Sequence, residues 1–138
     1  MAAIENRSSF EEFDADAILE EILGICDDRV RSFAEYDAQT YNIMYMSERM
    51  VDQFESEDEI DDLSDRIHSD YRLDFTEKEM YEDVYAELGE VRAFSVFFTR
   101  SVIFRFVGER TGLYISVDRD APFNEIIDAV YDSIEAPS

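Results

Sequence analysis

Three consecutive segments between residues 91 and 118 constrain the fold most strongly. They read VRAFSVFFT, SVIFRFVGE and TGLYISVD, and each is rich in the aromatic and β-branched residues that favour strands. A tight turn at Arg100–Ser101 separates the first two segments, and a turn between Gly108 and Gly112 separates the second two. The sequence therefore predicts three antiparallel strands in a meander.

Two earlier segments predict a β-hairpin. RVRSFAEYD and TYNIMYMSE are joined around Asp37–Ala38–Gln39, and the second places Tyr41, Ile43 and Tyr45 at alternate positions. Together with the meander, this hairpin predicts an antiparallel five-stranded sheet.

Helical periodicity precedes and separates these strands. Ser9 and Glu12 have the spacing of a capping box, and the apolar residues behind them repeat at helical intervals to about residue 28. Residues 47–88 are also helical in period, with further capping boxes at Ser56–Glu59 and Thr76–Glu79. Gly89 follows in the position where a glycine commonly ends a helix.

The order of elements defines the fold class. A last amphipathic helix begins at Pro122, so the order is α-β-β-α(α)-β-β-β-α. A sheet of this kind with helices packed on it is an α+β fold. We expect a flexible N-terminus over residues 1–8 and a single α+β domain over residues 9–138.

The charge balance predicts the solvent in which the chain works. It has 35 acidic and 12 basic residues among 138, a formal net charge of −23, and every basic residue except Lys78 is arginine. Carboxylates bind water and cations, whereas lysine adds an apolar stem, so this composition suits molar salt. Near 1 M salt the Debye length falls to about 3 Å, which makes such self-repulsion tolerable. We expect a protein of an extreme halophile with non-specifically bound salt cations.

The same composition bears on partners and location. Direct nucleic-acid binding is disfavoured, because non-specific binding depends on Lys and Arg neutralising phosphates. No apolar run approaches the roughly 20 residues of a membrane span, and the first residues lack the features of a signal peptide. These observations predict a cytoplasmic protein without a membrane partner.

The sequence offers no catalytic, cofactor or metal residues. His68 and Cys26 are the single histidine and cysteine, which excludes a catalytic triad or a zinc site built from several of these residues. The four glycines are isolated, so there is no phosphate-binding loop. The acidic run ESEDEIDDLSD, residues 55–65, lacks the glycine of a calcium loop and fits a solvated helix face with Ile60 and Leu63 inward. We therefore expect a protein that is not an enzyme.

The meander departs from the acidity of the rest of the chain. Residues 91–119 contain five arginines but only Glu109 and Asp118 as acids. These arginines either pair with the acidic helices or mark a surface kept for an acidic partner or a second subunit. The predicted interaction surface consists of Arg92, Phe104, Arg105 and Arg110.

Two resemblances follow from these segments. RVRSFAEYDAQTYNIMYMSE and GLYISVDRDA resemble a small, uncharacterised haloarchaeal protein family over about residues 15–135. The order of elements resembles the roadblock (dynein light-chain type) fold, although residues 47–88 are longer and more broken than one crossover helix. The roadblock resemblance implies homodimers that serve as regulatory platforms for small GTPases and motility machinery.

Three functional hypotheses remain open. The leading one is a non-enzymatic, homodimeric interaction or regulatory module that uses the meander surface and an unknown protein partner. An alternative is a small-ligand sensor with a pocket between sheet and helices, lined by Tyr41, Tyr45 and Phe97. A weaker one is a transcription-associated regulator that places the helices of residues 57–88 near DNA.

Overall fold

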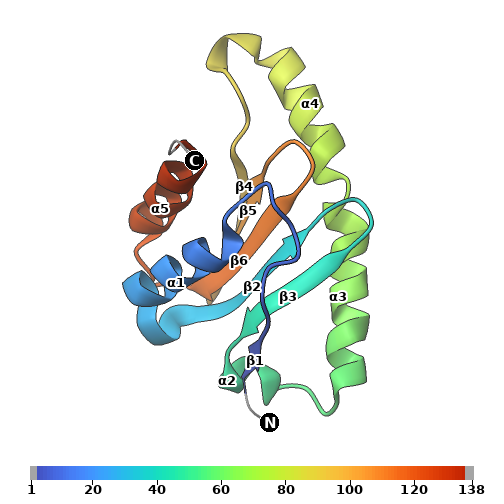
Figure 1. The fold of residues 1–138 in the computed structure, drawn as a ribbon, viewed down its shortest axis with the longest axis vertical. Coiled ribbons are helices and arrows are strands. Elements are labelled where there is room, and N and C mark those ends of the chain that lie inside the picture. The colour runs from blue at the N-terminus through green and yellow to red at the C-terminus, as the bar shows by residue number, and fades with distance from the viewer. Residues whose placement is uncertain (1–2, 136–138) are drawn as a thin grey trace.

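The computed structural model describes residues 3–135, and they form an antiparallel sheet with helices on both faces (Figure 1). The strands are β1 (Ile4–Glu5), β2 (Val30–Tyr36), β3 (Tyr41–Met46), β4 (Ala93–Phe97), β5 (Ser101–Val107) and β6 (Gly112–Asp118). The helices are α1 (Ala15–Cys26), α2 (Glu48–Val51), α3 (Glu57–Tyr71), α4 (Asp74–Val84) and α5 (Phe123–Glu135), with 3-10 turns η1 (Asp27–Arg29) and η2 (Ala86–Leu88). The α+β class, the hairpin and the meander are confirmed.

The strand order is β1-β3-β2-β6-β5-β4, so the sheet has six strands. The prediction of five was wrong because β1, within the N-terminal segment expected to be flexible, pairs with β3. Ile4 lies opposite Met46, and the backbone N–H of Asn6 donates to the carbonyl of Met44. Residues 1–2, which belong to the N-terminus expected to be flexible, and residues 136–138, which end the expected domain, lie outside the described residues.

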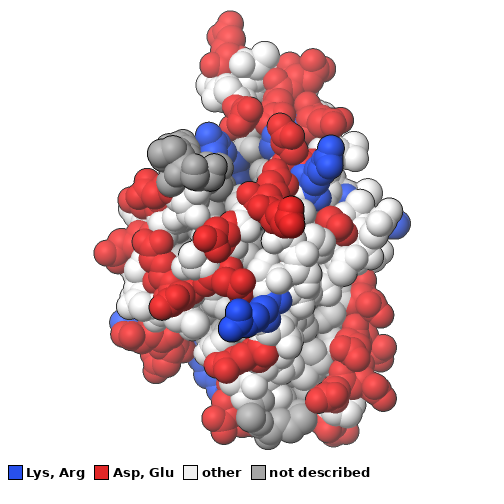
Figure 2. Space-filling model, viewed as in Figure 1, with Lys and Arg blue, Asp and Glu red and all other residues white. Residues whose placement is uncertain are grey.

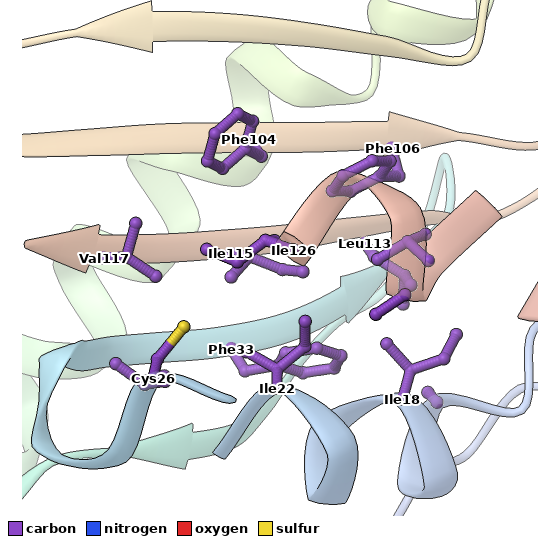
Figure 3. Packing of buried hydrophobic residues seen from close by; sticks show 14 of the residues in the cluster. Ile18, Ile22, Cys26, Phe33, Phe104, Phe106, Leu113, Ile115, Val117 and Ile126 are labelled. Atoms are coloured by element: carbon purple, nitrogen blue, oxygen red, sulfur yellow. The ribbon is translucent and has the colours of Figure 1, made fainter. Parts of the chain in front are cut away.

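The main core lies between one face of the sheet and the helices α1 and α5 (Figure 3). Alternate residues of β5 and β6 point into it, because successive side chains of a strand face opposite sides. The central buried residues are Ile18, Ile22, Phe104, Phe106, Leu113, Ile115, Val117 and Ile126. Helices α1 and α5 therefore owe their positions to continuous apolar contact with the sheet.

The second face carries α3 and the start of α4. Here smaller apolar clusters form, one around Tyr36 and Tyr114 with Tyr71 and Phe75, the other around Val51 and Ile60. In α3 the predicted arrangement is confirmed, since Ile60 is buried and the acidic side chains Asp58, Asp61, Asp62 and Asp65 are exposed.

Three predicted capping boxes have different outcomes. Ser56 does cap α3, because its side chain accepts from the backbone N–H of Glu59. The box at Ser9–Glu12 is wrong: α1 begins later, and Asp14 caps it by accepting from Ala17. The box at Thr76–Glu79 is also wrong, since α4 begins at Asp74 without a side-chain cap.

Glu12 has a different role from helix capping. Its carboxylate accepts from the backbone N–H groups of Glu109, Arg110 and Thr111, at 2.6, 3.0 and 2.7 Å, in the β5–β6 turn. Partial burial would raise the pKa of Glu12, but these donors outweigh it and lower the pKa. A side chain at Gly108 would collide with this carboxylate. The contact fixes the segment before α1 to the meander.

Candidate protein-interaction surface

Strand β4 forms one edge of the sheet and has unusual features for an exposed edge. Among the described residues it pairs with β5 alone, at the opposite edge from the two-residue β1. Its sequence, AFSVF, contains no charge and no proline, and no register shift interrupts its pairing. Edge strands are normally protected from association by such charges, prolines or bulges. Strand β4 therefore offers an unprotected edge.

The direction of the backbone groups of β4 follows from its pairing. Val107 donates to the carbonyl of Arg92, and Phe98 donates to the carbonyl of Ser101. In an antiparallel pair the residues alternate between bonding to the partner strand and pointing away from it. Phe94 and Val96 thus bond to β5, whereas the backbone groups of residues 93, 95 and 97 point outward.

Helix α4 exposes an apolar side near this edge. Met80, Val84 and Leu88 recur every four residues as one apolar stripe, a pattern that is typical of a helix side packed on a core. Instead these side chains are 52%, 65% and 82% exposed. Figure 1 shows the reason: the C-terminal end of α4 and η2 project beyond the end of the sheet, which leaves this side of the helix outside the packed layers.

Aromatic contacts join the helix to the edge strand. Tyr81 of α4 lies 5.7 Å, between ring centroids, from Phe94 of β4, and it stacks on Tyr85 at 6.0 Å. Val96 lies on the same face of β4 as Phe94 and is partly exposed. We call the resulting patch the β4–α4 surface; it consists of Met80, Tyr81, Val84, Tyr85, Leu88 and Val96.

Acidic residues alternate with the apolar residues of this surface, since Glu79, Asp83 and Glu87 directly precede Met80, Val84 and Leu88. Acidic side chains are spread over the face of the molecule seen in Figure 2, and Lys and Arg are few. At the top of the view, where α4 and η2 project in Figure 1, uncharged residues appear between the acidic ones. Isolated exposed apolar residues are ordinary, but a group of them beside an open strand edge is typical of an association surface.

The four residues of the predicted interaction surface do not share a face. Phe104 is buried under α1 and α5, whereas Arg105, its neighbour in β5, points to the opposite face. Arg92 lies over the ring of Tyr131 in α5, and Arg110 is exposed in the β5–β6 turn. These four residues do not form one continuous surface, because adjacent residues of a strand point in opposite directions.

Arg105 pairs with an acidic residue of a helix, which is one of the two alternatives that the sequence left open for the arginines of the meander. Its Nη1 lies 3.3 Å from Oδ1 of Asp74 in α4. Asp74 is only 2% exposed, and its other oxygen accepts from the hydroxyl of Tyr36 at 2.7 Å. Burial raises the pKa of Asp74 despite these two partners.

The residues of the predicted ligand pocket are also separated. Tyr41 lines a hollow of about 370 Å³ between β3 and α3, together with Ile43, Ile60 and Ser64. Tyr45 packs against the main core, and Phe97 lies in β4 at the far edge of the sheet, where it contacts Phe123. Strands β3 and β4 are separated by three others, so these three residues cannot line one pocket.

Two further classes of site are absent from residues 3–135. No group of three or more His, Cys, Asp or Glu side chains in this range is placed to hold a metal ion. None of the helices there is long and apolar enough to cross a membrane.

A family model matches residues 16–135, and its description is a domain of unknown function, DUF7522. The chain belongs to this family. The match agrees with the small uncharacterised family expected over residues 15–135. No curated protein sequence matches the chain.

Solved structures identify the fold as that of roadblock domains. A roadblock/LC7 domain from Streptomyces avermitilis superimposes with a TM-score of 0.60 at 12% identity, covering 87% of this chain and 91% of that one. The gliding protein MglB from Thermus thermophilus gives 0.55 at 14% identity, covering 94% and 90%. MglB from Myxococcus xanthus gives 0.54 at 9% identity, covering 93% of each chain. The DUF7522 chain thus has a roadblock-like fold, as its order of elements predicted.

Proposed function

We propose that this DUF7522 protein is a non-enzymatic regulatory module that works as a homodimer, with a second copy covering the β4–α4 surface. The observation that carries the proposal is that an uncharged strand, paired on one side only among the described residues, lies beside an exposed apolar side of a helix. Either feature alone is common. Together they form a surface that the described part of the chain leaves uncovered.

A second copy is the occupant that suits this surface. Two β4 strands meeting edge to edge in antiparallel fashion would satisfy each other's outward backbone groups around a two-fold axis near Ser95. The same symmetry would bring two copies of α4 together, so that their apolar sides cover each other. Exposed acidic residues, Glu79, Asp83 and Glu87, lie next to these apolar residues in the chain, so two copies of charge −23 repel each other and molar salt is needed to screen that repulsion.

The roadblock-like fold of the structural neighbours supports a regulatory role. One of them is described as MglB with tetrameric arrangement, at a TM-score of 0.55, and it covers 94% of this chain. That assembly belongs to MglB, and at 16% identity the likeness to this chain is one of fold. A roadblock-like fold with an open β4 edge is consistent with a platform that assembles first and then binds a regulatory partner.

The test exploits the direction of the backbone at Ser95. The substitution Ser95→Pro removes a backbone N–H that points away from β5, so the pairing with β5 keeps its hydrogen bonds, as in natural edge prolines. We expect the variant to fold and to sediment as a monomer at concentrations where the wild type is a dimer. Ser95→Ala is the matched control, because it changes the side chain and leaves the backbone donor in place.

Sedimentation is measured at molar salt and at low salt, since the predicted halophilic origin makes both conditions informative. A wild type that is monomeric at every concentration and salt would overturn the proposal. So would a Ser95→Pro variant that folds and dimerises as tightly as the wild type, because the interface would then lie elsewhere.

The hollow beside Tyr41 supports a second candidate, a small-ligand sensor. Its volume of about 370 Å³ lies within the usual range for ligand sites, and Asn6, Asp61 and Ser64 add polar groups to an apolar lining. A ligand bound there would raise the melting temperature of the wild type. Tyr41→Ala should abolish that shift. If no metabolite of a broad panel shifts the melting temperature at high salt, this candidate fails.

A further inference from the structure

We infer that the buried pair of Asp74 and Arg105 positions α4, and that it thereby holds the β4–α4 surface in the orientation that a second copy requires. The inference rests on the proposed function for its consequence, dimerisation. Its structural part, the positioning of α4, can be tested independently.

Asp74 fixes the beginning of α4 to two different strands. It is the first residue of the helix and the single buried residue within it. One carboxylate oxygen accepts from Tyr36 of β2 at 2.7 Å, and the other lies 3.3 Å from Nη1 of Arg105 of β5. Tyr36 is fully buried and the side chain of Arg105 is 16% exposed, so both partners of Asp74 lie in packed surroundings.

Arg105 extends this connection to α3 and to the edge strand. Its guanidinium lies 4.7 Å from the ring centroid of Tyr71, the last residue of α3, and 5.4 Å from that of Phe94 in β4. Stacking of this kind suits the planar guanidinium better than an ammonium group. One side chain thus contacts the end of α3, the start of α4 and the edge strand.

The pair can control the direction of α4 because its member Asp74 is the one buried residue of this short helix. The helix is separated from α3 only by Arg72 and Leu73, and its distal residues are exposed. Among the described residues, Phe75 also contacts Tyr36, Tyr81 contacts Phe94, and Glu82 accepts from the backbone N–H of Val91. A change at the first residue of the helix would therefore alter the direction of its projecting end.

A pair that only stabilised the fold would give a different result from a pair that positions α4. Buried ion pairs frequently contribute little net stability, because desolvating both charges costs as much as their attraction returns, and some of them instead select one geometry. The Nε of Arg105 is buried without a hydrogen-bond partner among the described residues, a further cost. Removing both charges together should consequently leave the fold intact while loosening α4.

The test uses the double variant Asp74→Asn/Arg105→Met, which removes both charges and keeps similar side-chain sizes. The matched control is Asp120→Asn/Arg29→Met, which removes an exposed pair with a 3.9 Å contact. Amide hydrogen exchange is followed in α4 and in β6, in a Val84→Asp background designed to prevent dimerisation. The dimer dissociation constant is then measured for each pair without the Val84 substitution.

We expect the Asp74/Arg105 variant to accelerate exchange in α4 by about tenfold, with β6 unchanged, and to weaken dimerisation by about tenfold or more. The control pair should change neither quantity. Unchanged α4 exchange and unchanged dimerisation in a folded Asp74/Arg105 variant would overturn the inference. Equal acceleration in α4 and β6 would also overturn it, because the pair would then stabilise the whole domain.

Two results keep this test separate from that of the proposed function. A monomeric wild type would overturn the proposed function, and the exchange in α4 would still decide whether the pair positions the helix. If the double variant does not fold, Arg105→Lys replaces it, since lysine keeps the charge and loses the stacking geometry. Faster exchange confined to α4 in that variant supports the inference, and exchange equal to wild type contradicts it.

Discussion

Helix α5 and the segment of α4 and η2 both repeat apolar residues at an interval of four, and their surroundings differ. In α5, Ile126 and Val130 are fully buried between α1 and the sheet. In α4 and the η2 turn that follows, Val84 and Leu88 repeat at the same interval of four residues, yet both are exposed. The comparison teaches that periodicity identifies the apolar side of a helix and not what covers it. An uncovered stripe beside an open strand is where a second molecule is expected.

The largest expected difference lies in the stability of the two regions. Ile126→Ala should lower the free energy of unfolding by about 2–5 kcal/mol, because it leaves a cavity in the packed core. Leu88→Ala, which removes a similar apolar volume, should change it by less than about 0.5 kcal/mol in dilute, monomeric protein. Denaturant unfolding of both variants measures this contrast. Equal losses would mean that Leu88 is covered within the monomer.

A second prediction concerns Glu12, which belongs to the well-packed region although its side chain is partly exposed. Glu12→Gln should cost about 1 kcal/mol, since its carboxylate accepts several hydrogen bonds from the β5–β6 turn. Glu11→Gln, in the same segment, is the matched control and should be neutral.

The pH dependence of Glu12 has a definite sign. Its folded-state pKa is lowered, so the stabilisation it provides is present above its ordinary value of 4.5 and is lost as the pH falls through the folded-state value. The difference in unfolding free energy between wild type and Glu12→Gln should therefore shrink in acid. A difference that stays constant below pH 4.5 would contradict the role of the carboxylate.

The smallest predicted effect contrasts the beginnings of α3 and α4. Ser56→Ala should lower the free energy of unfolding by about 1 kcal/mol, because it removes the cap on the backbone N–H of Glu59. Thr76→Ala, at the corresponding place in the predicted box of α4, should cost less, within about 0.5 kcal/mol. Thermal unfolding measures both. A larger loss at Thr76 would indicate a capping contact that the structure does not contain.

The contrast between these regions also shows what could be predicted from the sequence. The meander, the hairpin and α5 were predictable because their periodicity, turns and glycines agree with one another. Strand β1 was not, since two residues carry no period and their pairing with β3 is a contact distant in sequence. Glu12 was assigned to a helix cap by its spacing from Ser9, although its donors lie in a turn almost a hundred residues away.

The candidate site was predictable only in part. Clustering of arginine in the meander did point to Arg105, but not to the buried Asp74 that pairs with it among many exposed carboxylates. The β4–α4 surface had one available signal, the stripe of Met80, Val84 and Leu88 with Tyr81 and Tyr85 beside it. That signal is ambiguous in sequence, because a core helix and an association helix are apolar on one side for the same physical reason.

Amide hydrogen exchange along β4 at several protein concentrations tests the central claim most directly. If a second copy pairs with this edge, the outward amides of Ser95 and Phe97 should become protected as concentration rises, while the inward amides of Phe94 and Val96 stay protected throughout. Outward amides that exchange rapidly at every concentration, including concentrations at which the protein is dimeric, would show that the second copy binds elsewhere.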